Sequence, residues 1–150
     1  MLCAIDNADR RAWLGLLARA PVALLEDWAQ RQPQRSFTWL RKPETGLAMV
    51  RARIGGSGAK FNLGEMTITR CVLRLGEATC GVAYVQGRSH RKAQLAALAD
   101  ALLQTGESDA VRRELLAPLS ASLQAEAARM RAKAQATQVE FFTVARQGGA

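Results

Sequence analysis

The sequence predicts a single α+β domain over residues 1–150, in which an antiparallel sheet of about four strands is flanked by N-terminal and C-terminal helices. Three observations support this fold class. The hydrophobic pattern repeats every three to four residues towards both ends and every second residue in the middle. The expected strands follow one another through short connections, whereas parallel strands need a crossover of a dozen residues or more. A length of 150 residues is typical of one domain, and neither an internal repeat nor a linker is evident.

Two helices are expected before the sheet. Asn7 or Asp9 suits the N-cap of the first helix, because its side-chain oxygen accepts from a free backbone N–H. The apolar residues of this helix fall on one face: Trp13, Leu16, Leu17 and Ala20. Pro21 suits the first position of a second helix, which ends near Gln30. Its apolar residues are Leu24, Leu25 and Trp28.

The middle of the chain has the alternation typical of β-strands. Strands are predicted over residues 36–40, 47–54, 65–75 and 80–86. Turns or loops are predicted over residues 42–46, 55–58 and 76–79, where glycine, proline and polar residues gather. The sheet is therefore expected to be an antiparallel meander.

The last hairpin has an unusual distribution of apolar residues. A turn at Glu77-Ala78 would set Cys71 opposite Tyr84, and Cys80 opposite Leu75. One face would then carry Cys71, Leu73, Leu75, Val82 and Tyr84. The other would carry Met66, Ile68, Val72, Ala83 and Val85, interrupted by Arg70 and Arg74. In a sheet with one solvent-exposed face, apolar and polar side chains alternate more regularly along each strand. Both faces are therefore expected to be at least partly covered, by the chain's own helices or by another protein.

Helices are expected again after the sheet. Ser89 suits the N-cap of a helix that runs to Gln104. The buried stripe of this helix consists of Leu95, Leu98, Ala99 and Leu102. A short helix over residues 110–116 should stop before Pro118, and an Ala-rich helix should run from Ser120 to Ala136. Residues 139–144 are compatible with helix or strand, and the pattern favours a strand.

The chain is strongly basic, since its 21 Lys and Arg exceed its 13 Asp and Glu by 8. Such a surplus indicates an acidic or phosphorylated partner. No apolar run approaches the ~20 residues of a membrane span, and Asp6 interrupts the N-terminus too early for a signal peptide. The three cysteines, Cys3, Cys71 and Cys80, are expected to be free thiols. Together these features predict a cytoplasmic protein.

A glycine-rich segment at residues 55–60 resembles a phosphate-binding loop only superficially. A P-loop needs Gly-Lys-Ser/Thr at the start of a helix, whereas Lys60 is followed by Phe61 and predicted strands. One interpretation is a hairpin loop in which glycine permits positive φ. The other is a backbone nest for an anion, with Arg51, Arg53 and Lys60 within reach.

A second basic cluster, residues 87–92, lies at the expected start of a helix. Cations there oppose the helix dipole by ~0.3–1 kcal/mol each, so a bound anion would relieve the conflict. Arg88, His90 and Arg91 are the candidates to hold it; alternatively, they extend into water. Because His90 is the only histidine, a histidine metal site or a Ser-His-Asp triad within this chain is poorly supported.

The remaining polar and aromatic residues favour structural roles. Asp100 flanks the buried stripe of its helix and is expected to pair with a strand arginine such as Arg70. Glu44 and Glu65 lie in a turn and at a strand start, and no two carboxylates have a spacing that identifies an acid and a base. The tryptophans and phenylalanines are expected in the core or an interface rather than in a base-stacking platform.

Several segments, in order and spacing, carry a family resemblance. They are Glu44-Thr45-Gly46-Leu47, the run from Ala52 to Gly58, Phe61, Gly64-Glu65-Met66-Thr67, Thr69-Arg70, Tyr84, Gly87-Arg88, Asp100-Ala101-Leu102, Pro118-Leu119 and the ending Val139 to Arg146 with Phe141-Phe142. Over nearly its whole length the chain resembles the PhnG subunit of the bacterial carbon–phosphorus lyase system. The family ending is closer to FFTMVR, so Val144-Ala145 departs from it, and Cys80 is also atypical.

The resemblance implies a cytoplasmic subunit of a hetero-oligomer with PhnI most directly, and with PhnH, PhnJ and the ABC-like PhnK and PhnL. In that system PhnG, PhnH, PhnI and PhnL displace adenine from ATP with methylphosphonate, giving α-D-ribose 1-methylphosphonate 5-triphosphate. PhnI supplies the nucleosidase activity, and the iron–sulfur cluster and S-adenosylmethionine belong to PhnJ. The family gives PhnG no agreed catalytic role, so a structural or substrate-holding partner without a cofactor of its own is expected.

The candidate residues follow from both lines of argument. Candidates for binding an anion, substrate or partner are Arg53, Gly55, Gly56, Gly58, Lys60, Arg70, Arg88, His90 and Arg91. Residues expected to act structurally are Glu44, Thr45, Gly46, Glu65, Asp100, Phe141 and Phe142. No catalytic residue and no metal ligand is assigned. The alternative function is a small basic nucleic-acid-binding module, although no helix-turn-helix, RRM or zinc pattern supports it.

Overall fold

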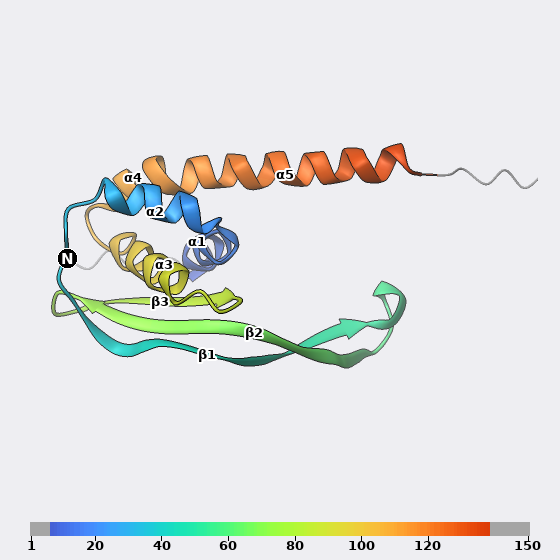
Figure 1. The fold of residues 1–150 in the computed structure, drawn as a ribbon, viewed down its shortest axis with the longest axis horizontal. Coiled ribbons are helices and arrows are strands. Elements are labelled where there is room, and N and C mark those ends of the chain that lie inside the picture. Colours follow the sequence, from blue (N-terminus) through green and yellow to red (C-terminus); the bar gives the residue numbers. More distant parts are fainter. Residues whose placement is uncertain (1–6, 139–150) are drawn as a thin grey trace, which may run out of the picture.

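A computed structural model describes residues 7–138 of the chain (Figure 1). The strands are β1 (Phe37–Arg53), β2 (Lys60–Leu75) and β3 (Thr79–Gln86). The helices are α1 (Asn7–Arg19), α2 (Val22–Gln30), α3 (His90–Leu102), α4 (Ser108–Val111) and α5 (Ala117–Ala136), with a 3-10 turn at Ile54–Gly56 and a π-helical turn at Arg112–Leu116. The α+β class and the flanking helices are confirmed, and the sheet has three strands between residues 7 and 138, where about four were expected.

The strand count differs because β1 is continuous through the predicted turn at residues 42–46. The register against β2 shifts twice there, between Trp39 and Arg41 and between Arg41 and Glu44. Such irregularities accommodate Pro43, which cannot donate to a ladder and is tolerated in an edge strand. β1 is the edge strand, since the strand order is β1-β2-β3. The turn signal therefore marks a bulged region within one long strand.

The β2–β3 register also differs from the prediction, by one residue. Cys71 lies opposite Ala83, and Cys80 lies opposite Arg74. A slip of one residue moves every side chain of a strand to the other face. The buried face carries Thr69, Cys71, Leu73, Gly81, Ala83 and Val85. The predicted free state of both thiols is confirmed, since Cys71 and Cys80 form no disulfide.

Among the described residues the helices cover one face of the sheet, and coverage of the other face by another protein stays a prediction (Figure 1). α3 lies directly on β2 and β3, and α1 and α2 pack against α3. Tyr84, on the opposite face, is 56% exposed.

As predicted, Ser89 caps α3, its Oγ accepting from the backbone N–H of Lys92. Trp13 and Trp28 are buried in the core, as expected of the tryptophans.

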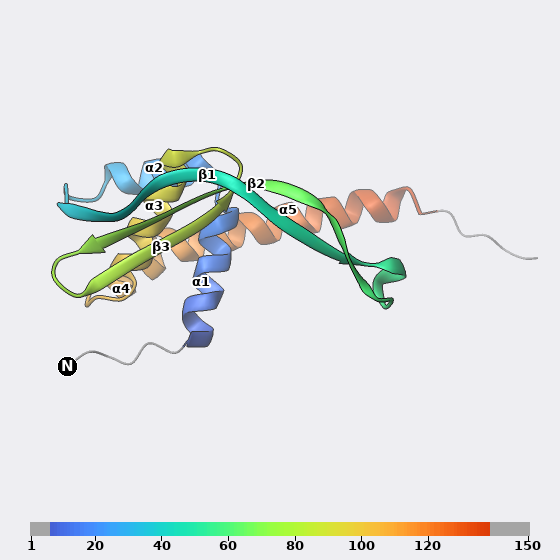
Figure 2. The same cartoon turned by 90° about the horizontal axis from the view of Figure 1, so that it is seen from below.

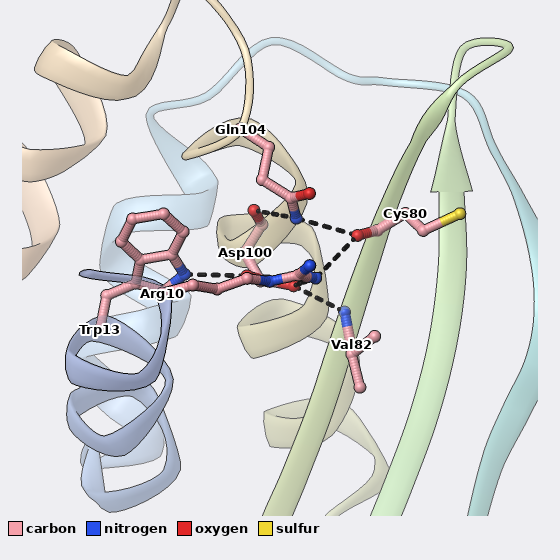
Figure 3. A network of polar contacts seen from close by, with 6 residues as sticks. All are labelled: Arg10, Trp13, Cys80, Val82, Asp100 and Gln104. Atoms are coloured by element: carbon pink, nitrogen blue, oxygen red, sulfur yellow. Dashed lines mark hydrogen bonds and ion pairs between the residues drawn. The ribbon is translucent and has the colours of Figure 1, made fainter. Parts of the chain in front are cut away.

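Asp100 is fully buried on α3 and joins three elements (Figure 3). Its carboxylate accepts from Arg10 Nε at 3.2 Å and Nη2 at 2.8 Å, and from Trp13 Nε1 at 2.8 Å. It also accepts from the backbone N–H of Val82 at 2.9 Å. The predicted pair with Arg70 was wrong, because Arg70 is on the face of the sheet that α3 does not cover. Asp100 thus links α1 and α3 to β3.

Two elements extend away from this core in the same direction (Figures 1 and 2). The first is the projecting arm, which we define as residues 46–67 of the β1–β2 hairpin. β3 ends at Gln86, opposite Ile68, so within the described residues the arm is a two-stranded ribbon. The second is the outer part of α5, residues 124–136, in which every residue is exposed.

α5 begins earlier than predicted. Pro118 lies in its first turn, where proline removes no intrahelical hydrogen bond, so the predicted break before Pro118 was wrong. The expected strand at residues 139–144, with Phe141 and Phe142, falls outside the described residues. None of the helices in the described part of the chain is long and apolar enough to cross a membrane.

Candidate functional site

The start of α3 and the base of the arm are joined by a chain of hydrogen bonds. Thr45 on β1 lies opposite Thr69 on β2, and their Oγ1 atoms are 3.1 Å apart. Thr45 Oγ1 is also 3.1 Å from Nε2 of His90, the first residue of α3. Thr69 Oγ1 donates to the carbonyl of Gly87 at 2.7 Å. The turn into α3 is held by the backbone N–H of Gly87, which donates to Thr67 at 2.9 Å.

These contacts assign the protons. Each threonine hydroxyl has one hydrogen, and that of Thr69 is used at the carbonyl of Gly87. Thr45 must then donate to Thr69, which leaves Thr45 Oγ1 as an acceptor for His90. His90 therefore carries a proton on Nε2, and its Nδ1 is the ring nitrogen left to meet a ligand or water.

The neighbouring cations do not converge on His90. Arg88 is exposed and forms no hydrogen bond or ion pair with the residues between 7 and 138. Arg91 Nε lies 4.0 Å from Glu26 Oε1 of α2. Burial lowers the pKa of the Lys92 ammonium. Of the predicted cluster, His90 is thus the residue with a hydrogen bond to β1 beside the base of the arm, through Thr45.

Arg91 instead lines an open groove of about 820 Å³ between α3 and the segment that follows α2. Leu95 and Leu98 contribute apolar surface to it, and Gln94 and Arg35 contribute polar groups. Arg35 is already paired with Glu107, through Nη1 at 2.8 Å and through Nη2. The groove is therefore a separate surface feature from the His90 chain.

The glycine-rich loop forms the tip of the arm and is stabilised by its own residues. Gly55 and Gly56 have φ of 57° and 80°, the region that favours glycine. The backbone N–H of Gly58 donates to Ile54 at 2.9 Å, and Arg53 Nη1 donates to the carbonyl of Gly58 at 2.9 Å. Lys60 is opposite Arg53 at the end of the ladder. These contacts favour the hairpin interpretation over the nest for an anion.

The two basic clusters do not form one site. The cluster at the tip of the arm includes Lys60, the first residue of β2. The cluster at the start of α3 follows Gly87, which is hydrogen-bonded to Thr67 and Thr69 further along β2. The strand between Lys60 and Thr67 spans about 23 Å at a rise of ~3.3 Å per residue. A single small anion cannot touch both.

Arg70 belongs to a third group, on the uncovered face of the sheet. Its Nε donates to Glu44 Oε1 at 2.7 Å, and Arg41 Nη1 donates to the same oxygen at 2.6 Å. Hydrogen bonds from Arg41 and Arg70 hold the pKa of Glu44 below its ordinary value. In the same way, the bond to Glu44 raises the pKa of Arg70. Arg70 is therefore engaged within the chain.

The other predicted residues lie apart from these groups. Gly46 is opposite Ile68 at the base of the arm, and Glu65 is exposed on the arm opposite Met49. No group of three His, Cys, Asp or Glu side chains in the described part of the chain is placed to hold a metal ion. Within residues 7–138 the arrangement offers hydrogen-bond donors and positive charge, and the hydroxyl of Thr45 accepts from His90 and does not donate to it.

Sequence reasoning missed three features of this region. Arg10 and Trp13 are the partners of Asp100, at separations of 90 and 87 residues that no local pattern reveals. The threonine chain to His90 was also missed, although a threonine at a buried strand position, Thr69, is a signal for an internal hydrogen bond. The third is the extent of the arm, because the second strand of its hairpin was predicted to begin at residue 65 and begins at Lys60.

Comparisons with known proteins match most of the length of this chain. The family described as "Phosphonate metabolism protein PhnG" matches residues 8–147. A curated relative from Rhizobium meliloti (strain 1021), named "Alpha-D-ribose 1-methylphosphonate 5-triphosphate synthase subunit PhnG", is 40% identical over 140 residues. The match covers 93% of this chain and 90% of the relative. The chain therefore belongs to the PhnG family of phosphonate metabolism proteins.

Proposed function

We propose that this chain is a subunit of α-D-ribose 1-methylphosphonate 5-triphosphate synthase. The observation that carries the proposal is the 40% identity, over 93% of the chain, with a relative that is named as a subunit of that synthase. The reaction transfers the ribose triphosphate of ATP to methylphosphonate and releases adenine. The chain acts in the cytoplasm during phosphonate catabolism, together with PhnH, PhnI and PhnL, and needs no cofactor of its own.

Its role is to support the nucleosidase partner PhnI and to help hold an anionic substrate. This role is supported by the environments of His90 and Asp100 and by the net charge of the chain. His90 is the only histidine in the sequence, and its Nε2 is bound to Thr45, while Asp100 is buried beneath Arg10 and Trp13. Besides Nδ1 of His90, the chain offers positive charge, with a net of +8. Such a surface attracts a phosphonate or a triphosphate without attacking it.

The chemistry requires methylphosphonate, rather than water, to reach the ribose carbon. A basic subunit that closes over the site would raise the local concentration of the phosphonate and exclude solvent. Both effects depend on shape and charge. Adding this chain to the other subunits should therefore move the products from ribose 5-triphosphate towards ribose 1-methylphosphonate 5-triphosphate.

Phosphorus NMR of the products, with and without this chain, tests the proposal. A product ratio that does not depend on the chain would refute it. His90→Ala should leave the transfer largely intact, because methylphosphonate itself is the attacking group and His90 is given no role as a base. If His90→Ala abolishes transfer while the subunits still assemble, the chain takes part in the chemistry.

Arg88 offers a second test of substrate or partner holding. Since it is exposed and unpaired within residues 7–138, Arg88→Ala should leave the fold unchanged. Loss of a charge-assisted contact should weaken triphosphate retention or assembly by roughly 1–3 kcal/mol. Arg11→Ala, at an exposed position on α1, is the matched control. If Arg88→Ala and Arg11→Ala retain triphosphate and partner subunits equally at every salt concentration, Arg88 has no role in binding them.

A further inference from the structure

The arm is too exposed to be explained by the fold of this chain. Strands usually have 3–10 residues, whereas β1 has 17 and β2 has 16. A two-stranded ribbon is at best marginally stable in water without a third strand or a covering helix. Of the nine large hydrophobic side chains exposed among the described residues, five lie on the arm: Leu47, Met49, Ile54, Phe61 and Leu63.

The exposed apolar residues extend a face that is covered elsewhere. Thr45 contacts His90 of α3, so by strand alternation Leu47 and Met49 lie on the same side of β1 as that helix. α3 begins at His90, beside Thr45, and the face continues beyond it uncovered (Figure 1). Leu47 is 64% exposed and Met49 is 51% exposed. Leu63 is 63% exposed and is the extra residue of a bulge, since Gly64 pairs with Val50 and Asn62 with Arg51.

The sheet also offers a free backbone edge at this place. β3 stops opposite Ile68, and Gly87, with φ of 89°, turns the chain away into α3. Thr67 still accepts from the backbone N–H of Gly87, and along residues 60–66 β2 has a partner on one side only within the described residues. Such an edge can pair with an added strand.

The charges select the kind of partner. The arm carries Arg51, Arg53 and Lys60 against one acid, Glu65. The outer part of α5, which extends in the same direction, carries Arg129, Arg131 and Lys133 against Glu126 (Figure 2). Both projecting elements are therefore basic, and two copies of a chain with a net charge of +8 would repel each other there.

We propose that the arm is the docking surface for another subunit of the synthase, which presents an apolar strip bordered by acidic residues. This inference rests on the proposed function. The apolar face of Leu47, Met49 and Leu63 supplies the buried centre of the interface, and Arg51 and Lys60 supply its basic rim. Large apolar side chains among the cations favour a protein partner over nucleic acid, which requires phosphate contacts above all.

Co-purification tests the inference. The tagged chain is co-expressed with PhnH, PhnI and PhnJ in cells starved of phosphate. The recovered material is divided, one half is treated with nuclease, and the protein and nucleic-acid content and the mass of both halves are measured. Leu47→Ser/Met49→Ser/Leu63→Ser should reduce recovery of partner subunits by about tenfold or more. Val22→Ser/Leu40→Ser/Tyr84→Ser, three side chains that are 40%, 51% and 56% exposed outside the arm, should not. Circular dichroism should show both variants folded.

A charge test identifies the chemistry of the partner. Arg51→Glu/Lys60→Glu should weaken association by about tenfold at low salt. Arg11→Glu/Arg31→Glu, which changes the net charge equally at exposed sites on other elements, should leave it unchanged. Similar losses from both pairs would overturn the acidic-partner assignment.

The outcomes separate the two proposals. If the unmodified chain recovers no partner subunit, the proposed function fails. If it recovers them and the serine arm variant does so equally, the docking inference alone is overturned. A discrete dimer of the isolated chain that the arm variant abolishes would also overturn it, as would recovery of nucleic acid in place of protein.

Discussion

At the scale of single residues, Asp100 is the most consequential polar group in the described core. It is fully buried and accepts four hydrogen bonds, two of them from Arg10. The network stabilises the fold only while every polar group in it has a hydrogen-bond partner, since removing one member leaves the others buried without partners. The same network explains why α1, which begins the described chain, is held against β3.

Asp100→Ala should lower the free energy of unfolding by about 3–5 kcal/mol. The substitution removes the carboxylate that accepts hydrogen bonds from Arg10, Trp13 and the backbone N–H of Val82. Urea denaturation measures this change. Asp9→Ala is the control, since Asp9 lies 3.6 Å from Arg112 in an exposed ion pair and should matter little. Equal stabilities of the two variants would show that the network does not hold the fold.

Cys71 should be chemically inert in the folded chain. Burial raises the pKa of its thiol from 9.0 to about 11, so the nucleophilic thiolate is scarce at neutral pH. Alkylation by iodoacetamide at about pH 8, followed by mass spectrometry of the peptides, should label the half-buried Cys80 well before Cys71. Labelling in urea, where both thiols are exposed, is the control. Equal labelling rates in the native protein would contradict the buried assignment.

The same shift makes stability depend on alkaline pH. The folded state keeps the Cys71 proton to a higher pH than the unfolded state, so this contribution to stability is fully present below pH 9.0. It is lost as pH rises towards about 11. In Cys71→Ala, the free energy of unfolding should fall less between pH 9.0 and about 11 than in the unmodified chain. The midpoints of urea denaturation at each pH measure this difference. An unchanged pH profile in the variant would show that the thiol does not contribute.

At the scale of elements, local signals in the sequence predicted the helices better than the sheet. Ser89 and the apolar stripe of α3 are sufficient to define that helix, because capping and a period of 3.6 are local properties. The β2–β3 register depends on where the turn closes, and an error of one residue there reversed the faces of β3. The partners of Asp100 are set by packing between α1 and α3, which no local pattern encodes.

The contact between α3 and β3 depends on a glycine. A Cβ at Gly81 would lie 1.9 Å from the carbonyl oxygen of Ala97 and 2.9 Å from the Cβ of Ala101. Gly81→Ala should therefore push α3 from the sheet and destabilise the fold by roughly 1–3 kcal/mol. Gly64→Ala on the arm, where a Cβ meets nothing within 4 Å, is the matched control. Thermal unfolding distinguishes them, and a Gly81→Ala protein as stable as the control would disprove this close packing.

At the scale of the whole molecule, the fold combines a packed core with two projecting elements. The core consists of α1, α2, α3, the buried residues between Val111 and Leu119, and the part of the sheet that the helices cover, while the arm and residues 124–136 of α5 extend beyond it (Figure 1). The excess of apolar residues in the strands indicated that both faces of the sheet are covered, by the chain's own helices or by another protein. It did not indicate where a partner would be needed, because β2 was predicted to begin at residue 65, whereas it begins at Lys60 and so extends the ribbon beyond the helices.

The isolated chain should consequently behave poorly in solution. The arm exposes Leu47, Met49 and Leu63, a patch that soluble monomers rarely leave open. We expect binding of 1-anilinonaphthalene-8-sulfonate and a broad gel-filtration profile at moderate salt, both reduced when the partner subunits are added. Leu47→Ser/Met49→Ser/Leu63→Ser should bind less dye, whereas Val22→Ser/Leu40→Ser/Tyr84→Ser should bind as much as the unmodified chain. A clean monomer that binds no dye would show that these side chains do not form a patch needing cover, because free apolar surface accessible to solvent is what the dye reports.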